Sequence, residues 1–137
     1  MFNFKKSLDG STMQLVKMPA AAGNYKVGQA LTYTGGKLAA ASGNAVVQYI
    51  CADNAKLDAA GDIIVSPVTS DMIFNAKLTA FNAGTVVAGE RLQISADGMG
   101  VTATAATEES KAGAFIVDTC GAAATGDTIE VRLDYYN

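Results

Sequence analysis

The sequence predicts a mainly all-β protein, and three observations support this prediction. Apolar and polar residues alternate most clearly at residues 72–80 and 128–136, which is the period of a half-buried strand. Turn-forming pairs such as Gly35-Gly36 and Asp97-Gly98 separate segments of this kind. Aromatic residues make up only 7% of the chain and tryptophan is absent. Such a composition suits thin, turn-rich β structure better than a deep aromatic pocket.

The same order of sequence signals occurs twice. Each copy has a Gly-x-x-Leu stretch, an apolar run that ends in cysteine, and a Gly-Asp pair that opens a strand-like segment: residues 28–38, 45–51 and 61–65, then residues 89–98, 114–120 and 126–131. The offset between the copies is 61 residues at Gly28 and Gly89 but 69 at Cys51 and Cys120. Unequal offsets indicate insertions between elements, or chance similarity of two hairpins. We expect a small barrel or β-tulip-like sheets, with two fused copies of one β module as one alternative.

Three parts of the chain follow from these patterns. Residues 1–12 are expected to form an N-terminal arm, residues 13–82 a first β module, and residues 83–137 a second module that can pack with the first as one domain. In the arm, Phe2 and Phe4 alternate with polar residues before the Asp9-Gly10-Ser11 break. Chain ends commonly fray. The alternative is a segment that orders on a partner, with Phe2 and Phe4 as anchors.

Local patterns predict further elements in the first module. Gly35-Gly36 fits a tight hairpin turn, and residues 45–51 are apolar at nearly every position, as in a strand covered on both faces. Residues 54–61 could form one helical turn, with Asn54 as N-cap. Pro67 interrupts the strand at residues 62–68, which predicts an edge position because proline cannot donate to a ladder.

Composition excludes several classes of function. The net charge is −3 and no basic run extends beyond Lys5-Lys6, so the clustered positive charge needed for nucleic acid is missing. Histidine is absent, and two cysteines cannot complete a structural zinc site. No stretch has the length of a signal peptide or a membrane helix. We therefore expect synthesis in a cytoplasm, no membrane, and two cysteines that remain buried thiols.

Candidate catalytic groups do not form a constellation in the sequence. Asp53, Asp58 and Asp62 lack the alternating spacing of a calcium loop, and Glu108 and Glu109 would point apart on a strand. The remaining nucleophiles and bases have no activating neighbour: Ser95, Ser110, Lys37, Cys51 and Cys120. We expect no enzymatic activity, no cofactor and no metal.

One motif points to another class of function. Glu109-Ser110-Lys111-Ala112 lies between apolar segments, as does the hairpin of lipoyl and biotinyl carrier domains, which exposes an acceptor lysine. The residues around Lys111 match that pattern only loosely, and the second half is short for such a domain. Lys111 as a carrier site therefore remains the less favoured alternative.

The order of signals resembles the head-decoration, or capsid cement, proteins of tailed bacteriophages. The similarity spans residues 14–137 and rests on small apolar strands and glycines: Gly28-x-x-Leu31, Gly36-Lys37-Leu38, Val46-Val47-Gln48-Tyr49-Ile50 and Gly61-Asp62-Ile63-Ile64-Val65, with the closing Gly126-Asp-Thr-Ile-Glu-Val-Arg-Leu133 in the second copy. The doubled module departs from the short members of this family.

The resemblance implies a structural virion protein on the outer surface of the capsid. Members of the family brace the major capsid protein non-covalently, usually as trimers, and their N-terminal arms often order on the capsid. It therefore implies a homo-oligomer, with a trimer favoured and no catalytic residue or metal. The expected capsid contacts are Phe2, Phe4, Lys5 and Lys6. Other phage β proteins, of the tail tube or head fibre, are the alternative.

Overall fold

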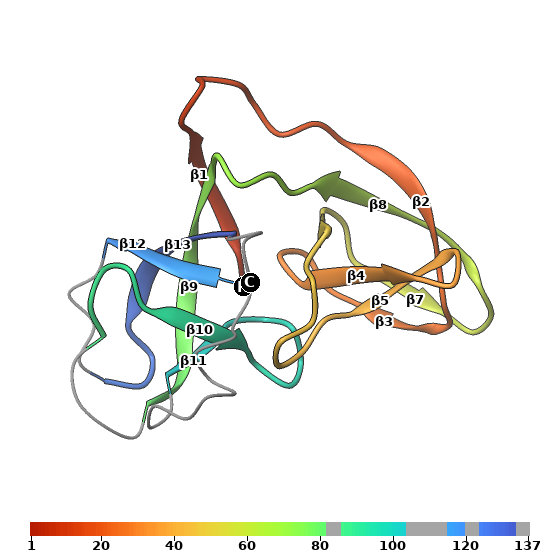
Figure 1. Cartoon of the computed structure of the whole chain (residues 1–137). Coiled ribbons are helices and arrows are strands. Elements are labelled where there is room, and N and C mark those ends of the chain that lie inside the picture. Colours follow the sequence, from red (N-terminus) through yellow and green to blue (C-terminus); the bar gives the residue numbers. More distant parts are fainter. Residues whose placement is uncertain (82–85, 104–114, 120–123, 134–137) are drawn as a thin grey trace.

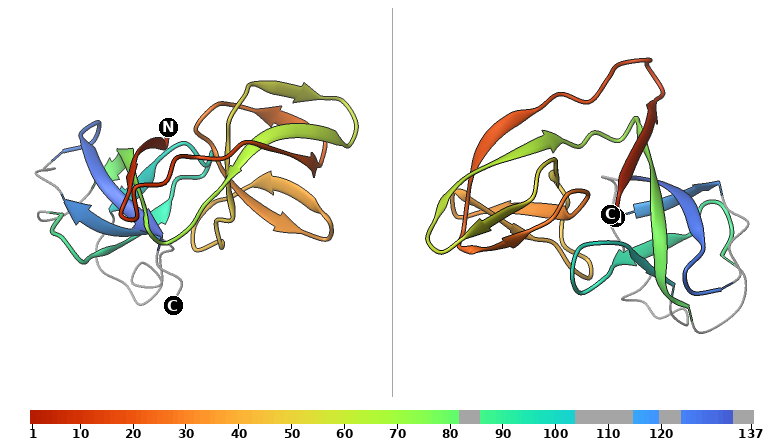
Figure 2. Two further views of the ribbon diagram at one scale, coloured as in Figure 1. Left: turned by 90° about the horizontal axis from the view of Figure 1, so that it is seen from above. Right: turned by 180° about the vertical axis from the view of Figure 1, so that it is seen from behind.

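The computed structural model describes residues 1–81, 86–103, 115–119 and 124–133. These residues form an all-β fold without a helix, which confirms the predicted fold class. Two lobes of strands lie side by side (Figures 1 and 2). The long strand β9 (Met72–Phe81) follows the first lobe and runs through the second.

The first lobe is a closed barrel of five strands in the order β2-β5-β4-β6-β8, here called the first ring. Its strands are β2 (Val16–Ala20), β4 (Ala30–Thr34), β5 (Lys37–Ala40), β6 (Tyr49–Cys51) and β8 (Gly61–Pro67). Two short strands, β3 (Gly23–Tyr25) and β7 (Ala55–Leu57), pair with each other beside it. The predicted hairpin at Gly35-Gly36 is confirmed, because β4 and β5 pair across it and both glycines have positive φ.

The second lobe repeats this arrangement. Its sheet has the order β1-β9-β11-β10-β12-β13, and a further pairing of β9 with β13 closes the five strands after β1. This second ring contains β9, β10 (Arg91–Ile94), β11 (Val101–Ala103), β12 (Phe115–Thr119) and β13 (Thr128–Leu133). The strand β1 (Asn3–Ser7) pairs with β9 from outside the ring.

The two rings have the same topology. In chain order, β2, β4, β5, β6 and β8 of the first correspond to β9, β10, β11, β12 and β13 of the second. The β2–β5 and β9–β11 pairs are parallel, and the other four pairs of each ring are antiparallel. Chance similarity of two hairpins would not reproduce five pairings. The chain therefore contains two fused copies of one β module.

The hydrogen bonds align the copies residue by residue. The amide of Gly28 donates to the carbonyl of Cys51 and that of Gly89 to the carbonyl of Val117, both at 2.8 Å. Cys51 therefore corresponds to Val117, and its predicted match with Cys120 is wrong by three residues. An apolar run in the sequence indicates a buried strand. Only the backbone hydrogen bonds between strands show which residues of the two copies correspond.

Three local predictions for the first module are corrected. Residues 55–57 form β7 rather than a helical turn, because they pair with β3 and Asn54 accepts a bond from the amide of Val27 (3.0 Å) instead of capping a helix. Strand β8 is not an edge: β2 pairs with residues 61–65, and Pro67 lies beyond that ladder, opposite β6. Residues 45–48 lie outside β6, and Val46 is 57% exposed.

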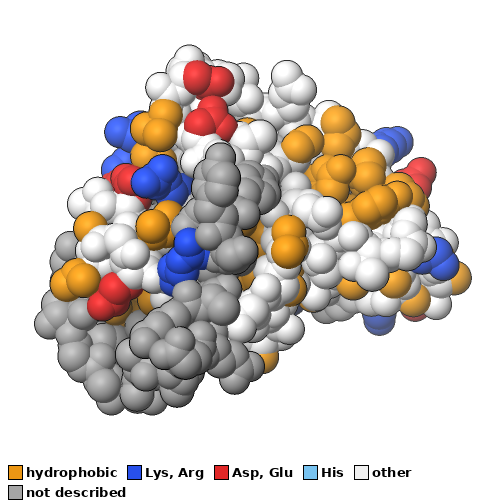
Figure 3. Space-filling model, in the orientation of Figure 1, with side chains coloured by type: hydrophobic (Ala, Val, Ile, Leu, Met, Phe, Trp, Pro, Cys, Tyr) orange, Lys and Arg blue, Asp and Glu red, His pale blue; other side chains and the backbone are white. Residues whose placement is uncertain are grey.

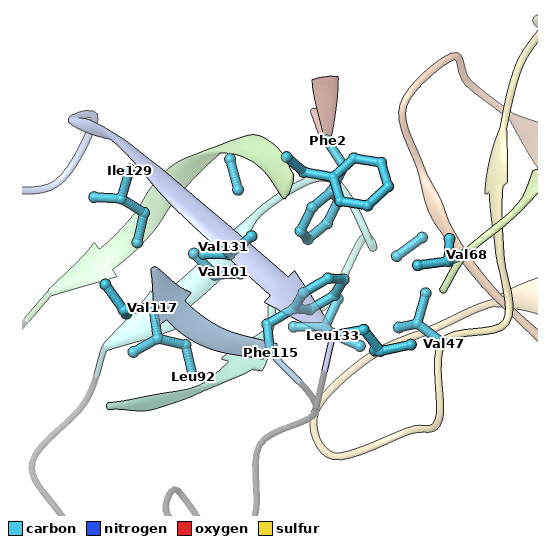
Figure 4. Packing of buried hydrophobic residues seen from close by; sticks show 14 of the residues in the cluster. Phe2, Val47, Val68, Leu92, Val101, Phe115, Val117, Ile129, Val131 and Leu133 are labelled. Atoms are coloured by element: carbon cyan, nitrogen blue, oxygen red, sulfur yellow. The ribbon is translucent and has the colours of Figure 1, made fainter. Parts of the chain in front are cut away.

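The strands group differently from the predicted division at residues 82 and 83, because β9 belongs to the second ring. One hydrophobic cluster fills the second ring and also takes in residues of the first lobe next to its strands, such as Val47 and Val68. Figure 4 shows these two side chains reaching toward Phe2 and Leu133. The first ring has a smaller cluster of its own around Leu31, Leu38 and Val65.

The turn between β10 and β11 joins the rings. Gly98 accepts a bond from the amide of Ala30 (2.8 Å), and a Cβ at Gly98 would lie 3.0 Å from the carbonyl oxygens of Ala30 and Ala41. Gly43 and Ile94 exchange two backbone bonds of 2.9 Å. A glycine is needed at residue 98 both for this close approach and for its φ of +73°.

Candidate interaction surface

The N-terminal residues belong to the folded structure, so the expected arm differs from what is found. Phe2 is 2% exposed, its ring stacks on Phe115 at a centroid distance of 4.7 Å, and its amide donates to Gly28 (2.8 Å). Phe4 is half-buried and meets Phe74 edge-on at 6.1 Å. Burying two phenylalanines stabilises the fold more than leaving them on a free tail. In this conformation neither the Phe2 nor the Phe4 side chain can serve as an exposed anchor.

The two lysines of β1 keep part of their surface. Lys5 forms an ion pair with Glu130 of β13, and its side chain is 41% exposed. Lys6 is exposed. Of the four predicted capsid contacts, Lys5 and Lys6 therefore remain accessible, while Phe2 and Phe4 act in packing.

Hydrogen bonds fix the end of β1. The Asp9 carboxylate accepts from the amide of Ser11 (2.9 Å), and the Ser7 hydroxyl shares its one proton between the carboxylates of Asp9 and Asp71, each 2.7 Å away. These donors, Ser7 first, hold the pKa of Asp9 below its usual range. The cluster anchors the turn after β1 to the start of β9. Both carboxylates, of Asp9 and Asp71, therefore have hydrogen-bond partners within the fold.

Strand β2 has an open backbone edge, here called the β2 edge. Residues 16–20 all pair with β8, but only Ala20 pairs with β5 on the opposite side. No described strand pairs with residues 16–19 on that side. Leu15 and Val16 are 64% and 37% exposed there. In the space-filling view, hydrophobic side chains gather over β2 and β8 (Figure 3). Unpaired backbone next to exposed apolar groups is the feature that an added strand uses.

The residues considered as catalytic or metal-binding candidates build a turn, are exposed without forming a site, or lie outside the described residues. Ser95 donates to Asp97 (2.7 Å) and accepts from the amide of Gly100 (2.9 Å), which builds the β10–β11 turn. Asp53, Asp58, Asp62 and Lys37 are exposed. Among the described residues no group of three histidine, cysteine, aspartate or glutamate side chains could hold a metal ion. Glu108, Glu109, Ser110, Lys111 and Cys120 lie outside the described residues.

Cys51 is a buried thiol. Burial raises its pKa, and its sulfur donates to the carbonyl of Asp53 at 3.0 Å. A raised pKa lowers the thiolate fraction and with it the reactivity. The same cause, burial, raises the pKa of Tyr25, whose hydroxyl donates to the carbonyls of Ala21 (2.7 Å) and Leu38 (3.1 Å).

The β2 edge was not predicted from the sequence. Residues 13–18 are apolar enough for a strand, but nothing local shows which side of a strand has a neighbour. The second ring identifies it: the pairings of Ala20 with Leu38 and of Leu78 with Val101 align residues 14–17 with residues 72–75, which β1 covers.

No helix long and apolar enough to span a membrane occurs in the described part of the chain. Comparison of the sequence with protein-family models and with curated proteins gives no match.

Proposed function

We propose that the protein is a structural virion protein that binds the outer surface of a major capsid lattice and stabilises the head non-covalently. It is made in the host cytoplasm and ends up on the capsid as a homo-oligomer. The resemblance to decoration proteins supports this function. Most of the residues that carry the resemblance lie in turns and strands of the two rings, and Val65 and Val131 occupy corresponding positions in them.

The observation that carries the proposal is the duplication itself. Two rings of one topology, joined by a shared hydrophobic cluster, hold two outer surfaces in a fixed arrangement. A capsid lattice offers related sites at fixed spacings. Linking two weak binding surfaces raises the overall affinity without a deep pocket, provided the geometry lets both engage. Such a protein works through its surface.

Binding to heads tests the proposal directly. Expanded heads that lack decoration are mixed with the purified protein, sedimented, and imaged by electron microscopy with and without it. We expect saturable binding and ordered density at repeated positions on the outer surface. Failure to sediment with heads at any protein concentration would reject the function.

Charge reversal at Lys6 locates the contact. Removing residues 1–12 would also remove the buried Phe2 and the strand β1, so loss of binding would report unfolding. Lys6→Glu changes an exposed side chain, and Lys37→Glu, on the β4–β5 hairpin, is the matched control. We expect Lys6→Glu alone to lower head occupancy. Equal occupancy of both variants would remove β1 from the contact surface.

A further inference from the structure

The two rings differ at one edge. In the second ring, one side of β9 pairs with β1 at residues 72–75 and with β11 at residues 78–81. In the first ring, the same side of β2 is paired only at Ala20. The place that β1 fills in the second ring has no counterpart strand among the described residues of the first.

The register identifies the uncovered residues. Ala20 pairs with Leu38 as Leu78 pairs with Val101, so Val16 corresponds to Phe74 and Leu15 to Ile73. Phe74 and Ile73 are 0% and 2% exposed. Leu15 and Val16 are exposed, as described above. The first ring therefore carries apolar side chains at positions that a sixth strand buries in the second ring.

The backbone of this edge is free to pair. The amide of Ala21 donates to Leu38 of β5 (2.9 Å), so residue 21 directs its backbone groups to the open side. Alternate residues of a strand share this direction. Lys17 and Leu15 therefore also direct their N–H and C=O groups outward.

A strand like β1 does not fit the β2 edge well. In the second ring, Lys5 of β1 pairs with Glu130 of β13. The residue of β8 that corresponds to Glu130 is Ile64, because Lys17 pairs with Ile64 as Asn75 pairs with Glu130. A lysine of an added β1 would find an isoleucine there. The occupant of this edge should instead present apolar side chains.

We propose that the β2 edge pairs with the β2 edge of a second copy across a two-fold axis. A two-fold axis beside a strand makes the neighbouring copy antiparallel, and β1 is antiparallel to β9 at the corresponding edge. Centring the axis at Val16 places Leu15 of each copy opposite Lys17 of the other. Their outward backbone groups then form the hydrogen-bonded pairs of an antiparallel ladder.

Side chains favour the same register. In the second ring, Val131 pairs with Phe74 and Phe74 pairs with Phe4, which gives an apolar row across three strands. In the first ring this row contains Val65 and Val16 and then ends. A second copy extends it with its own Val16 and Val65. Lys17 is the only charged residue between residues 13 and 19, and it faces Leu15 of the other copy, so no like charges are directly opposed.

Cysteine cross-linking tests this arrangement in solution, without heads, so its outcome is independent of head binding. Opposed side chains of a non-hydrogen-bonded antiparallel pair are close enough for a disulfide. In a Cys120→Ser background, we expect Val16→Cys to form a covalent dimer on mild oxidation. Val46→Cys, at another exposed valine, is the control and should remain monomeric on a non-reducing gel. Equal cross-linking of both variants, or none at residue 16, would overturn the proposal.

The oligomeric state gives a second readout. Light scattering should show a wild-type dimer that dissociates on dilution, and Val16→Lys should be monomeric because it places two lysines at the axis. Val46→Lys should remain a dimer. Thermal melting of both lysine variants checks that they fold. A wild-type protein that is monomeric at all attainable concentrations, or a folded Val16→Lys dimer, would overturn the proposal.

Discussion

Phe2 stacks on Phe115 with their ring centroids 4.7 Å apart and their planes inclined by 20°. This contact joins the N-terminal residues to β12, near the other end of the chain. The side chains of Phe2 and Phe115 are both buried. Phe2 thus supports the cluster shared by the two rings.

Replacing Phe2 with alanine should destabilise the protein strongly. Removing a buried phenylalanine costs about 3–5 kcal/mol, so the urea midpoint should fall markedly. Phe4→Ala, at a half-buried position, should cost less. The measurement is equilibrium unfolding of both variants and the wild type. Equal, small losses would mean that the N-terminal residues are detached in solution.

Gly98→Ala should destabilise more than Gly35→Ala. Both glycines have positive φ, +73° and +61°, so each variant pays the strain of a left-handed backbone, about 1–2 kcal/mol. Only at Gly98 would the new methyl group also lie 3.0 Å from two carbonyl oxygens, whereas nothing lies within 4 Å at Gly35. The difference between the two unfolding free energies measures the close contact between the rings. Identical losses would show that this contact is absent.

Asp97 should make stability depend on pH below 4. Bonds from the Ser95 hydroxyl and the Met99 amide lower the pKa of Asp97 from its ordinary value of 3.8. The unfolded state then binds more protons, so the stabilisation is present above pH 3.8 and is lost as the pH falls towards the folded-state pKa. Asp97→Asn should flatten this part of the stability profile, measured by urea unfolding from about pH 2.5 to about pH 6, the range over which carboxyl groups titrate. An unchanged slope would contradict the prediction.

Cys51 should resist alkylation until the protein unfolds. Burial raises its pKa, so the thiol stays protonated in the folded state at a pH where an unfolded cysteine, with a pKa of about 8.5, begins to ionise. In a Cys120→Ser background, iodoacetamide should modify Cys51 slowly in buffer and rapidly in guanidinium chloride, as followed by intact mass. The sign of the linkage predicts that stability falls as the pH rises above about 8.5. Rapid modification of the folded protein would show that the first ring opens.

The strands of the second ring were the easier part to predict. Alternation at residues 72–80 and 128–136 corresponds to β9 and β13, where Phe74, Ala76 and Leu78, and Ile129, Val131 and Leu133, are buried. In a strand with one face on the core, the alternation of apolar and polar residues shows which face is buried. The short strand β7 has no such pattern, because three residues cannot show an alternation and its pairing depends on β3.

The N-terminal segment and the β2 edge were missed for a different reason. The partners of the N-terminal segment are distant in sequence, because β1 pairs with β9 and Phe2 stacks on Phe115, and local patterns contain no information about such contacts. Nor does the composition of a strand show whether its second edge is paired. The ladders of the two rings supply that information, because they align residues 14–17 with residues 72–75 and place Val16 where the core residue Phe74 lies.

The position of β1 also sets the order in which the chain can fold during synthesis. Every strand of the first ring has been made by Pro67, so that ring can close before the second. The second ring needs β13, which ends at Leu133, and Phe2 needs Phe115. The segment made first is therefore among the last to find its place. Until β9 has been made, β1 has no strand to pair with, whereas the β2 edge stays exposed throughout.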